Sequence, residues 1–131
     1  MRLRPMQMSD ADFMLALKND PVTRQFAIVS KEEIKREDHL KWLEKNIQYF
    51  QVIEKWTGEM VGAIRIQDNE ISIWIDKAYR EMGIATKILS RINFIGCWGK
   101  IVDGNVASLR AFVKAGFTPR AHIDNYYILE R

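Results

Sequence analysis

Hydrophobic and polar residues alternate most clearly in the middle of the chain, where they predict strands. In residues 70–76, EISIWID, three isoleucines alternate with serine, tryptophan and aspartate, which is the period of a half-buried strand. Two more strands are predicted over residues 49–55 and 60–67, and Gly58 between them can adopt the positive φ of a hairpin turn. The pattern therefore predicts consecutive antiparallel strands joined by short turns.

Helical spacing precedes these strands. A short strand is expected over residues 2–6, and Ser9 is expected to cap a helix that stops at the NDP sequence of residues 19–21. A second helix is predicted over residues 31–46 because apolar residues recur there at helical spacing. Those residues are Ile34, Leu40, Leu43 and Ile47.

Helical spacing returns after Gly83. Four isoleucines then fall on one helical face: Ile84, Ile88, Ile92 and Ile95. Residues 105–116 predict a further helix, with Asn105 at its N-cap and Gly116 at its C-terminal end. Short strands are predicted over residues 100–102, 119–123 and 126–131.

The predicted order of elements is β-α-α-β-β-β-α-β-α-β-β. The β-α-β-α part implies some parallel pairing, and the hairpins imply antiparallel pairing. We therefore expect an α/β (mixed α+β) fold: a central, mostly antiparallel mixed sheet with helices on both faces. No linker or repeat divides the chain, so residues 1–131 are expected to form a single domain.

Composition and charge indicate which classes of ligand and partner the protein is expected to bind. The net charge of +3 suits a small anionic ligand, but the basic residues are scattered, so no nucleic acid is expected as a partner. No apolar run is long enough to span a bilayer, and no secretory signal precedes the domain, so neither a membrane partner nor export is expected. The lone Cys97 excludes an internal disulfide, offers no metal-site spacing and is interpreted as a structural thiol. A cytoplasmic location and no metal are expected.

The segment YREMGIATKIL, residues 79–89, lies between a predicted strand and a predicted helix. Free N–H groups of a first helical turn, with the positive end of the helix dipole, form an anion site without side chains. The small residues Gly83 and Ala85 would let a pyrophosphate approach the backbone, and Arg80 adds a positive charge. Alone, this motif is equally compatible with a glycine at an ordinary turn.

A second motif follows it. The segment NVASLRAFVKAGF, residues 105–117, together with Arg80, Gly83 and Ala85, resembles the paired motifs of the GNAT family of N-acetyltransferases. The predicted order of elements is also the order of that family, and the resemblance runs the whole chain. It implies an acetyl-CoA-dependent N-acetyltransferase with acetyl-CoA as cosubstrate and a primary amine as acceptor.

The resemblance also implies a set of cofactor-binding residues. The pyrophosphate would be held by the backbone of the loop, comprising Arg80, Glu81, Met82, Gly83, Ile84, Ala85 and Thr86. The pantetheine would lie beside Trp74, Ile75 and Asp76, and the backbone N–H near Ile75 would polarise the thioester carbonyl. Asn105 and Ser108 would contact the pantetheine or the leaving sulfur.

Amine transfer also needs a base and a route for the departing thiolate. Glu70 is a candidate base, although a charge at the start of a strand is also typical of a solvated position. Phe112 stands where the family commonly has a tyrosine acid; Tyr126 or Tyr127 could replace it, or the thiolate could leave without full protonation. Glu81 replaces a frequent glycine beside the phosphates.

Two stretches of the N-terminal half are expected to form the acceptor side, the part of the chain that binds the acceptor amine. They are LKNDPVTRQF, residues 17–26, and HLKWLEKN, residues 39–46. These stretches resemble bacterial acetyltransferases that act on amino-sugar nucleotides of the pseudaminic-acid type, and enzymes that modify protein N-termini share part of them. The resemblance implies that His39 and Trp42 line the acceptor cleft. The alternative is that Trp42 fills the space between helix and sheet and His39 lies on the surface.

Three hypotheses of function follow. The first is an N-acetyltransferase acting on a small amine such as an amino-sugar nucleotide, or on a protein N-terminus. The second is a non-catalytic acyl-CoA-binding domain, which Phe112 favours. The third is an interaction module without a CoA site, which would bind polyanions in a salt-dependent way. A C-terminal edge strand would also allow a homodimer.

Overall fold

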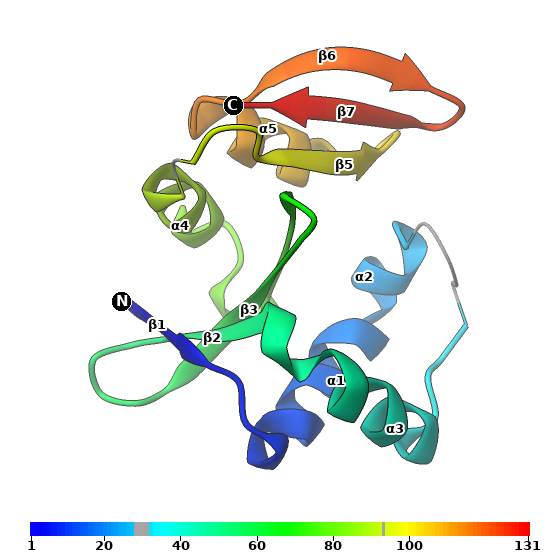
Figure 1. Ribbon diagram of the computed structural model, residues 1–131, viewed down its shortest axis with the longest axis vertical. Coiled ribbons are helices and arrows are strands. Elements are labelled where there is room, and N and C mark those ends of the chain that lie inside the picture. The colour runs from blue at the N-terminus through cyan, green and yellow to red at the C-terminus, as the bar shows by residue number, and fades with distance from the viewer. Residues whose placement is uncertain (28–31, 93) are drawn as a thin grey trace.

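A computed structural model describes residues 1–27, 32–92 and 94–131 (Figure 1). Its seven strands form one sheet in the order β1-β2-β3-β4-β5-β7-β6. The strands are β1 (Arg2–Pro5), β2 (Phe50–Glu54), β3 (Met60–Gln67), β4 (Glu70–Ile75), β5 (Trp98–Val102), β6 (Thr118–Ile123) and β7 (Tyr126–Glu130). The helices are α1 (Ala11–Asn19), α2 (Pro21–Gln25), α3 (Arg36–Asn46), α4 (Ile84–Arg91) and α5 (Val106–Lys114), with short 3₁₀ turns η1 (Met8–Asp10), η2 (Ile47–Tyr49) and η3 (Lys77–Tyr79).

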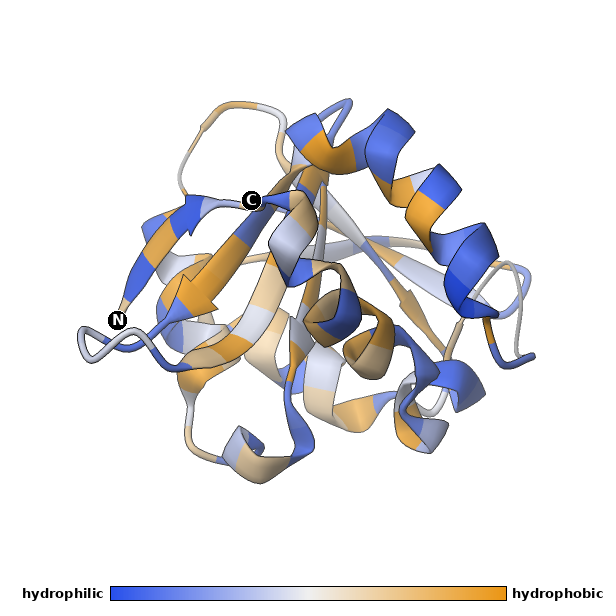
Figure 2. Cartoon of the chain, turned by 90° about the horizontal axis from the view of Figure 1, so that it is seen from below, coloured by the Kyte–Doolittle hydropathy of each residue, from blue (hydrophilic) through white to orange (hydrophobic). Residues whose placement is uncertain are grey.

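Helices cover both faces of the sheet, as the sequence predicts. Alternate residues of each strand point to opposite faces, so each face has its own core. Ile53 packs with α4 and α5 on one face, and its neighbour Val52 packs with α1 and α3 on the other. Figure 2 shows hydrophobic residues in the central strands and hydrophilic residues along much of α3.

The sheet opens between β4 and β5. These strands run parallel, whereas the other neighbours are antiparallel, and a single pair, Glu70 with Trp98, joins them. Beyond that pair no further residues of the two strands are paired, and Figure 1 shows β5, β6 and β7 lying apart from β1 and β2. The mixed, mostly antiparallel sheet is confirmed, and its opening at the carboxyl ends of two parallel strands is where α/β sheets commonly bind ligands.

Two predictions about the N-terminal helices are wrong in detail. Ser9 lies inside η1 and Asp10 is the N-cap of α1; the carboxylate of Asp10 accepts the Gln7 N–H at 2.9 Å instead. The second long helix begins at Arg36, because residues 32–35 are not helical; Lys31 lies outside the described residues. The spacing of apolar residues overestimated the length of that helix because it counted Ile34 as a helical position.

Helix α2 was not expected. Asp20 caps it by accepting the Val22 N–H at 3.0 Å, and Pro21 occupies its first turn, where proline is favoured. The side chain of Asn19 bonds both the N–H and the carbonyl oxygen of Ile34, at 2.7 and 2.9 Å. Asn19 thereby holds the two ends of the α1–α3 connection together.

Candidate functional site

The N-termini of α4 and α5 lie at the same edge of the sheet. Helix α4 follows β4 and α5 follows β5, and the carboxyl ends of parallel strands point the same way. The two helices also pack against each other on one face. Their N-terminal turns therefore flank the opening between β4 and β5.

The loop before α4 presents free backbone N–H groups. Within the described residues, the N–H groups from Arg80 to Thr86 have no recorded acceptor, and Lys87 is the first to donate, to the Gly83 carbonyl at 3.0 Å. Gly83 has a φ of 74° and Glu81 a φ of 64°, both in the left-handed region. This geometry fits the pyrophosphate site that the sequence predicts, because several donors and the positive end of α4 converge there.

The end of β4 directs one amide into the opening. The Asp76 N–H donates to the Val61 carbonyl at 2.9 Å, on the β3 side. Successive N–H groups of a strand point to opposite edges, so the Ile75 N–H is directed toward the side from which β5 has diverged. Gly62 makes the close approach of β3 and β4 possible, since a Cβ there would lie 2.3 Å from the Trp74 carbonyl oxygen.

Arg80 is paired within the protein. Its guanidinium donates to Asp20 at 3.0 Å, and both residues border an open pocket of about 300 Å³ between α1 and η3. Burial acts to raise the pKa of Asp20, but the hydrogen bond and charge of Arg80, together with the backbone N–H groups of Val22 and Thr23, outweigh it, so this pKa lies below its usual value. Lys77 and Asp76 line the same pocket.

Asn105 and Ser108 are brought together at the start of α5. The Asn105 side chain accepts the Ser108 N–H at 3.3 Å and acts as the N-cap, as predicted. Phe112, on the same helix, is 2% exposed and packs against Gly99 of β5 and edge-on against Phe117. The aromatic side chain at this position is therefore part of the core.

Glu70 and Tyr126 occupy different parts of the site. Glu70 begins β4, five residues before Ile75, which corresponds to a separation of about 17 Å along the strand at about 3.4 Å per residue. A base at Glu70 would thus act on an amine beside Ile75 only through water. Tyr126 pairs with Val102, the last residue of β5, and Lys100 Nζ lies 5.1 Å from its ring centroid.

His39 and Trp42 line a second open pocket, of about 230 Å³, together with Lys18, Ile34 and Asp38. His39 is 2% exposed, so the alternative of a surface residue is wrong: its Nε2 bonds the Ala11 carbonyl at 3.0 Å, and its Nδ1 has no partner among the described residues. Burial lowers the pKa of His39. Trp42 stacks on His39 and meets Phe50 edge-on, so it packs against the core and also borders the pocket.

Sequence reasoning missed three charged residues. Lys18 lies in the last turn of α1, Asp20 caps α2, and Arg65 lies in β3. Asp20 pairs with the distant Arg80, and the charge of Arg65 acts on Lys18. No local pattern reports a pair separated by 60 residues. Cys97 is buried, in agreement with its interpretation as a structural thiol.

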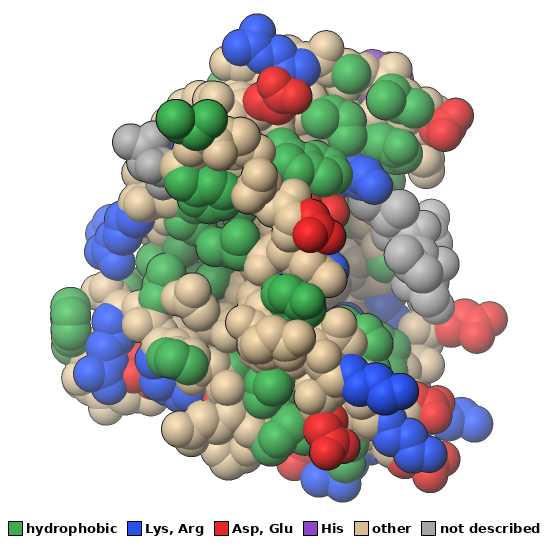
Figure 3. Space-filling view, viewed as in Figure 1, with side chains coloured by type: hydrophobic (Ala, Val, Ile, Leu, Met, Phe, Trp, Pro, Cys, Tyr) green, Lys and Arg blue, Asp and Glu red, His purple; other side chains and the backbone are tan. Residues whose placement is uncertain are grey.

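The residues that the structure describes contain no group of three or more His, Cys, Asp or Glu side chains arranged to hold a metal ion. Among the helices the structure describes, none combines the length and the apolar character needed to cross a bilayer. In the space-filling view, acidic and basic side chains are interspersed over α3 (Figure 3).

Comparison with known proteins identifies the family. Residues 1–118 match the family described as Acetyltransferase (GNAT) domain. This chain belongs to the GNAT acetyltransferase family. The family and fold expected from the paired GNAT motifs are thereby confirmed, whereas the roles of individual residues stay predictions.

The chain is also similar to individual known proteins. An uncharacterized protein of Methanocaldococcus jannaschii is 24% identical over 88% of this chain, and the chain spans only 27% of that relative's length. A solved domain from Methanocaldococcus jannaschii has a TM-score of 0.80 and 21% identity, covering 98% of this chain and 95% of that one. The Vibrio cholerae spermidine N-acetyltransferase in complex with CoA and spermine has a TM-score of 0.82 and 14% identity, covering 98% and 91%. At such identities the structural likeness shows the fold alone.

Proposed function

We propose that this GNAT domain is an acetyl-CoA-dependent N-acetyltransferase that acts on a small primary amine. One observation carries the proposal: the free N–H groups from Arg80 to Thr86 and the Asn105 cap flank the opening between β4 and β5. Family membership supplies the reaction class, and the spermidine enzyme supports an amine as acceptor.

The loop before α4 would hold the pyrophosphate. Several backbone donors and the positive end of α4 favour an anion there, and Arg80 supplies a positive charge at the rim. Acetyl-CoA supplies the activated acetyl group as a thioester. The chain in turn fixes its position, because binding at two helix N-termini and along the opening orients it relative to the acceptor.

The chemistry of transfer places separate demands on the chain. The Ile75 N–H, directed into the opening, would stabilise negative charge developing on the carbonyl oxygen. A free alkylamine has a pKa of about 10.4, so the acceptor must lose a proton near neutral pH; Glu70 would accept it through water. Tyr126 or a water molecule would protonate the leaving thiolate, since Phe112 cannot.

For the acceptor we propose an amino-sugar nucleotide. The resemblance of residues 17–26 and 39–46 to enzymes of the pseudaminic-acid type suggests it. The half-buried Trp42 beside a pocket provides an aromatic surface on which a sugar or base could stack. His39 and Trp42 would then border the acceptor.

Thermal unfolding in the presence of acetyl-CoA, CoA or ATP tests the cosubstrate site. A ligand at about 100 times its Kd adds about 2.7 kcal/mol to the free energy of unfolding, which raises Tm by several degrees. We expect a rise with acetyl-CoA and CoA and none with ATP. Ala85→Glu, which places a negative charge in the first turn of α4, should abolish the rise; Ser90→Glu, in the last turn of the same helix, should preserve it.

Thiol release with a panel of amines then tests turnover. Acceptor-dependent release of CoA supports the acetyltransferase. Binding of acetyl-CoA without release by amino-sugar nucleotides, polyamines or peptide N-termini would favour the non-catalytic acyl-CoA-binding domain instead. Absence of any shift with either CoA species would overturn the site itself.

A further inference from the structure

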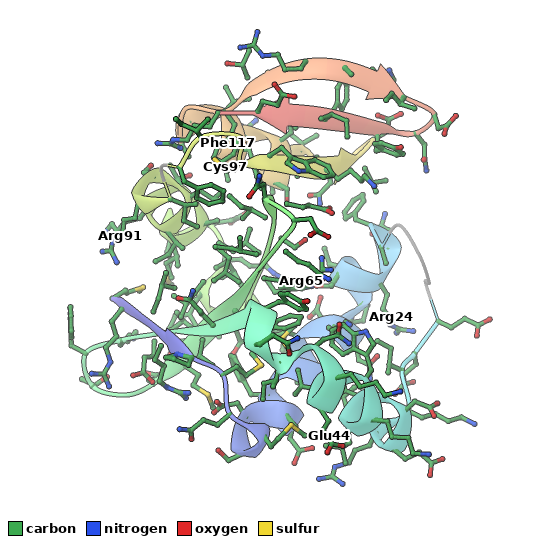
Figure 4. The ribbon with its side chains drawn as sticks, viewed as in Figure 1. Arg24, Glu44, Arg65, Arg91, Cys97 and Phe117 are labelled. Carbon is green, nitrogen blue, oxygen red and sulfur yellow. The ribbon has the colours of Figure 1, made fainter. Side chains whose placement is uncertain are left out.

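Two basic side chains are brought together beside β4 by the aromatic residues between them. Lys18 Nζ lies over the Trp42 ring, Trp42 packs edge-on against Phe50 at 5.5 Å between ring centroids, and Phe50 pairs with Arg65 across β2 and β3. Lys18 is in the last turn of α1, and Arg65 is near the end of β3. Burial lowers the pKa of the Lys18 ammonium to about 8, and the positive charge of Arg65 contributes to that change. Figure 4 shows Arg65 near the centre of the molecule, on the side of the strands that carries α1 and α2.

Neither residue has an acidic partner among the described residues. Lys18 Nζ lies 3.5 Å from the centroid of the Trp42 ring, and Arg65 donates to the neutral side-chain amide of Gln67. Asp38 borders the pocket of Lys18 but is exposed and forms no ion pair with it. The ion pairs that the structure records use other basic residues: Arg2, Arg4, Arg36, Lys55, Arg80 and His122.

The pair lies on the acceptor side of the sheet. Ala63, two residues before Arg65, packs in the core under α1 and α3, so alternation places Arg65 on that face. Arg65 pairs with Ser72, three residues before Ile75, which corresponds to about 10 Å along β4 at about 3.4 Å per residue. An acceptor amine beside Ile75 could therefore extend its far end to Arg65.

We propose that Lys18 and Arg65 form a binding site for an anionic group, a carboxylate or a phosphate, on the acceptor amine. An anion there would relieve the repulsion between two half-buried cations and restore hydrogen bonds that the chain does not supply. A polyamine would instead bring a further positive charge to the same place. The inference rests on the proposed acetyltransferase function and specifies its substrate class as amines that carry a negative charge.

The test compares four small acceptors. Each has a primary amine at one end of an alkyl chain, and they differ in the group at the other end. These are 6-aminohexanoate, 5-aminopentyl phosphate, 6-amino-1-hexanol and 1,6-diaminohexane. We expect kcat/KM to be about tenfold or more higher for the two anions, since hydrogen bonds to charged groups commonly contribute that much. Comparison of the first two compounds distinguishes a carboxylate from a phosphate.

Three variants test whether Lys18 and Arg65 cause the preference for anionic acceptors. Arg65→Gln should reduce the difference between the anions and the alcohol to about twofold or less, and Lys18→Met should reduce it in part. Lys41→Gln removes one positive charge from an exposed position on α3 and should keep the full preference. Equal kcat/KM values for all four acceptors, preference for the diamine, or an equal loss for every acceptor in Arg65→Gln would overturn the anion site.

A binding measurement separates this inference from the proposed function. Each acceptor is titrated calorimetrically into the chain saturated with CoA, so that the pyrophosphate loop is occupied. Tighter binding of the anions, lost in Arg65→Gln, supports the site even without turnover, whereas equal Kd values or no binding of the anions overturn it. Failure of CoA itself to bind contradicts the proposed function; the titration is then made into the free chain and judged by the same outcomes.

Discussion

The guanidinium of Arg80 and the carboxylate of Asp20 form an ion pair at 3.0 Å across 60 residues of sequence. Arg80 belongs to the predicted pyrophosphate loop, and Asp20 caps α2 at the start of the acceptor side. The pair therefore connects the two halves of the proposed site. It also means that a phosphate at the loop would compete with Asp20 for the same guanidinium.

Asp20→Asn isolates that competition. Asparagine keeps the capping oxygen but removes the negative charge, so Arg80 becomes free to bind phosphate. We expect the Kd for acetyl-CoA to fall about two- to fivefold and the free energy of unfolding to fall by no more than about 1 kcal/mol, because the pair is partly exposed. Calorimetric titration and chemical denaturation measure both. Weaker binding of acetyl-CoA by this variant would show that Asp20 positions Arg80 and does not compete for it.

Glu81 combines an unfavourable backbone conformation with an unfavourable charge. Its φ of 64° costs a non-glycine residue about 1 kcal/mol, and its carboxylate lies in a loop proposed to hold phosphates. Glu81→Gly should raise Tm and tighten acetyl-CoA binding. Glu81→Gln, which keeps the strain, should tighten binding without raising Tm; a rise in Tm equal to that of the glycine variant would assign the effect to charge.

Gly99 provides the space that the Phe112 ring occupies. A Cβ at this position would lie 2.4 Å from the Phe112 Cε1 atom, so Gly99→Ala should reduce the free energy of unfolding by about 1–3 kcal/mol. Displacement of α5 should also weaken acetyl-CoA binding through the Asn105 cap. Adding Phe112→Leu should recover part of the loss, which a double-mutant cycle measures as coupling. Additive losses would show that the two positions do not share this space.

Lys18 should make stability depend on pH in the alkaline range. Its pKa is about 8 in the folded chain and near 10.5 when unfolded, so between these values the unfolded state binds the extra proton. The free energy of unfolding contributed by this group therefore rises from pH 8 to pH 10.5. Lys18→Met should remove that rise and increase Tm at pH 7, relative to Lys41→Gln measured in parallel. Identical pH profiles for the two variants would contradict the shifted pKa.

Much of the fold could be predicted because its signals are local. The alternation of residues 70–76 and the left-handed turn at Asp68 and Asn69 lie within a few residues of one another. Helix α5 likewise has its own N-cap at Asn105. Such elements need no information from distant parts of the chain.

The errors occur where distant contacts decide the structure. Helix α2 is too short to show periodicity, and α3 begins late because Asn19 holds Ile34 outside the helix. The pyrophosphate loop was found from its motif, but the ion pair of Arg80 and the proximity of Lys18 to Arg65 depend on tertiary packing. Residues that tune a site by charge are thus harder to predict than the backbone that forms it.

Only the pair of Glu70 and Trp98 joins the two parts of the sheet, β1–β4 and β5–β7, which we call its two leaves. The leaves are connected at one end and separate toward the other. Most backbone donors along the inner edges of these leaves lack a strand partner, so the leaves can open with little loss of hydrogen bonding. A ligand bound between the two leaves would contact both and would stabilise their association. Amide hydrogen exchange should then slow in β7 and β6 as well as in β5, far beyond the atoms that the ligand touches.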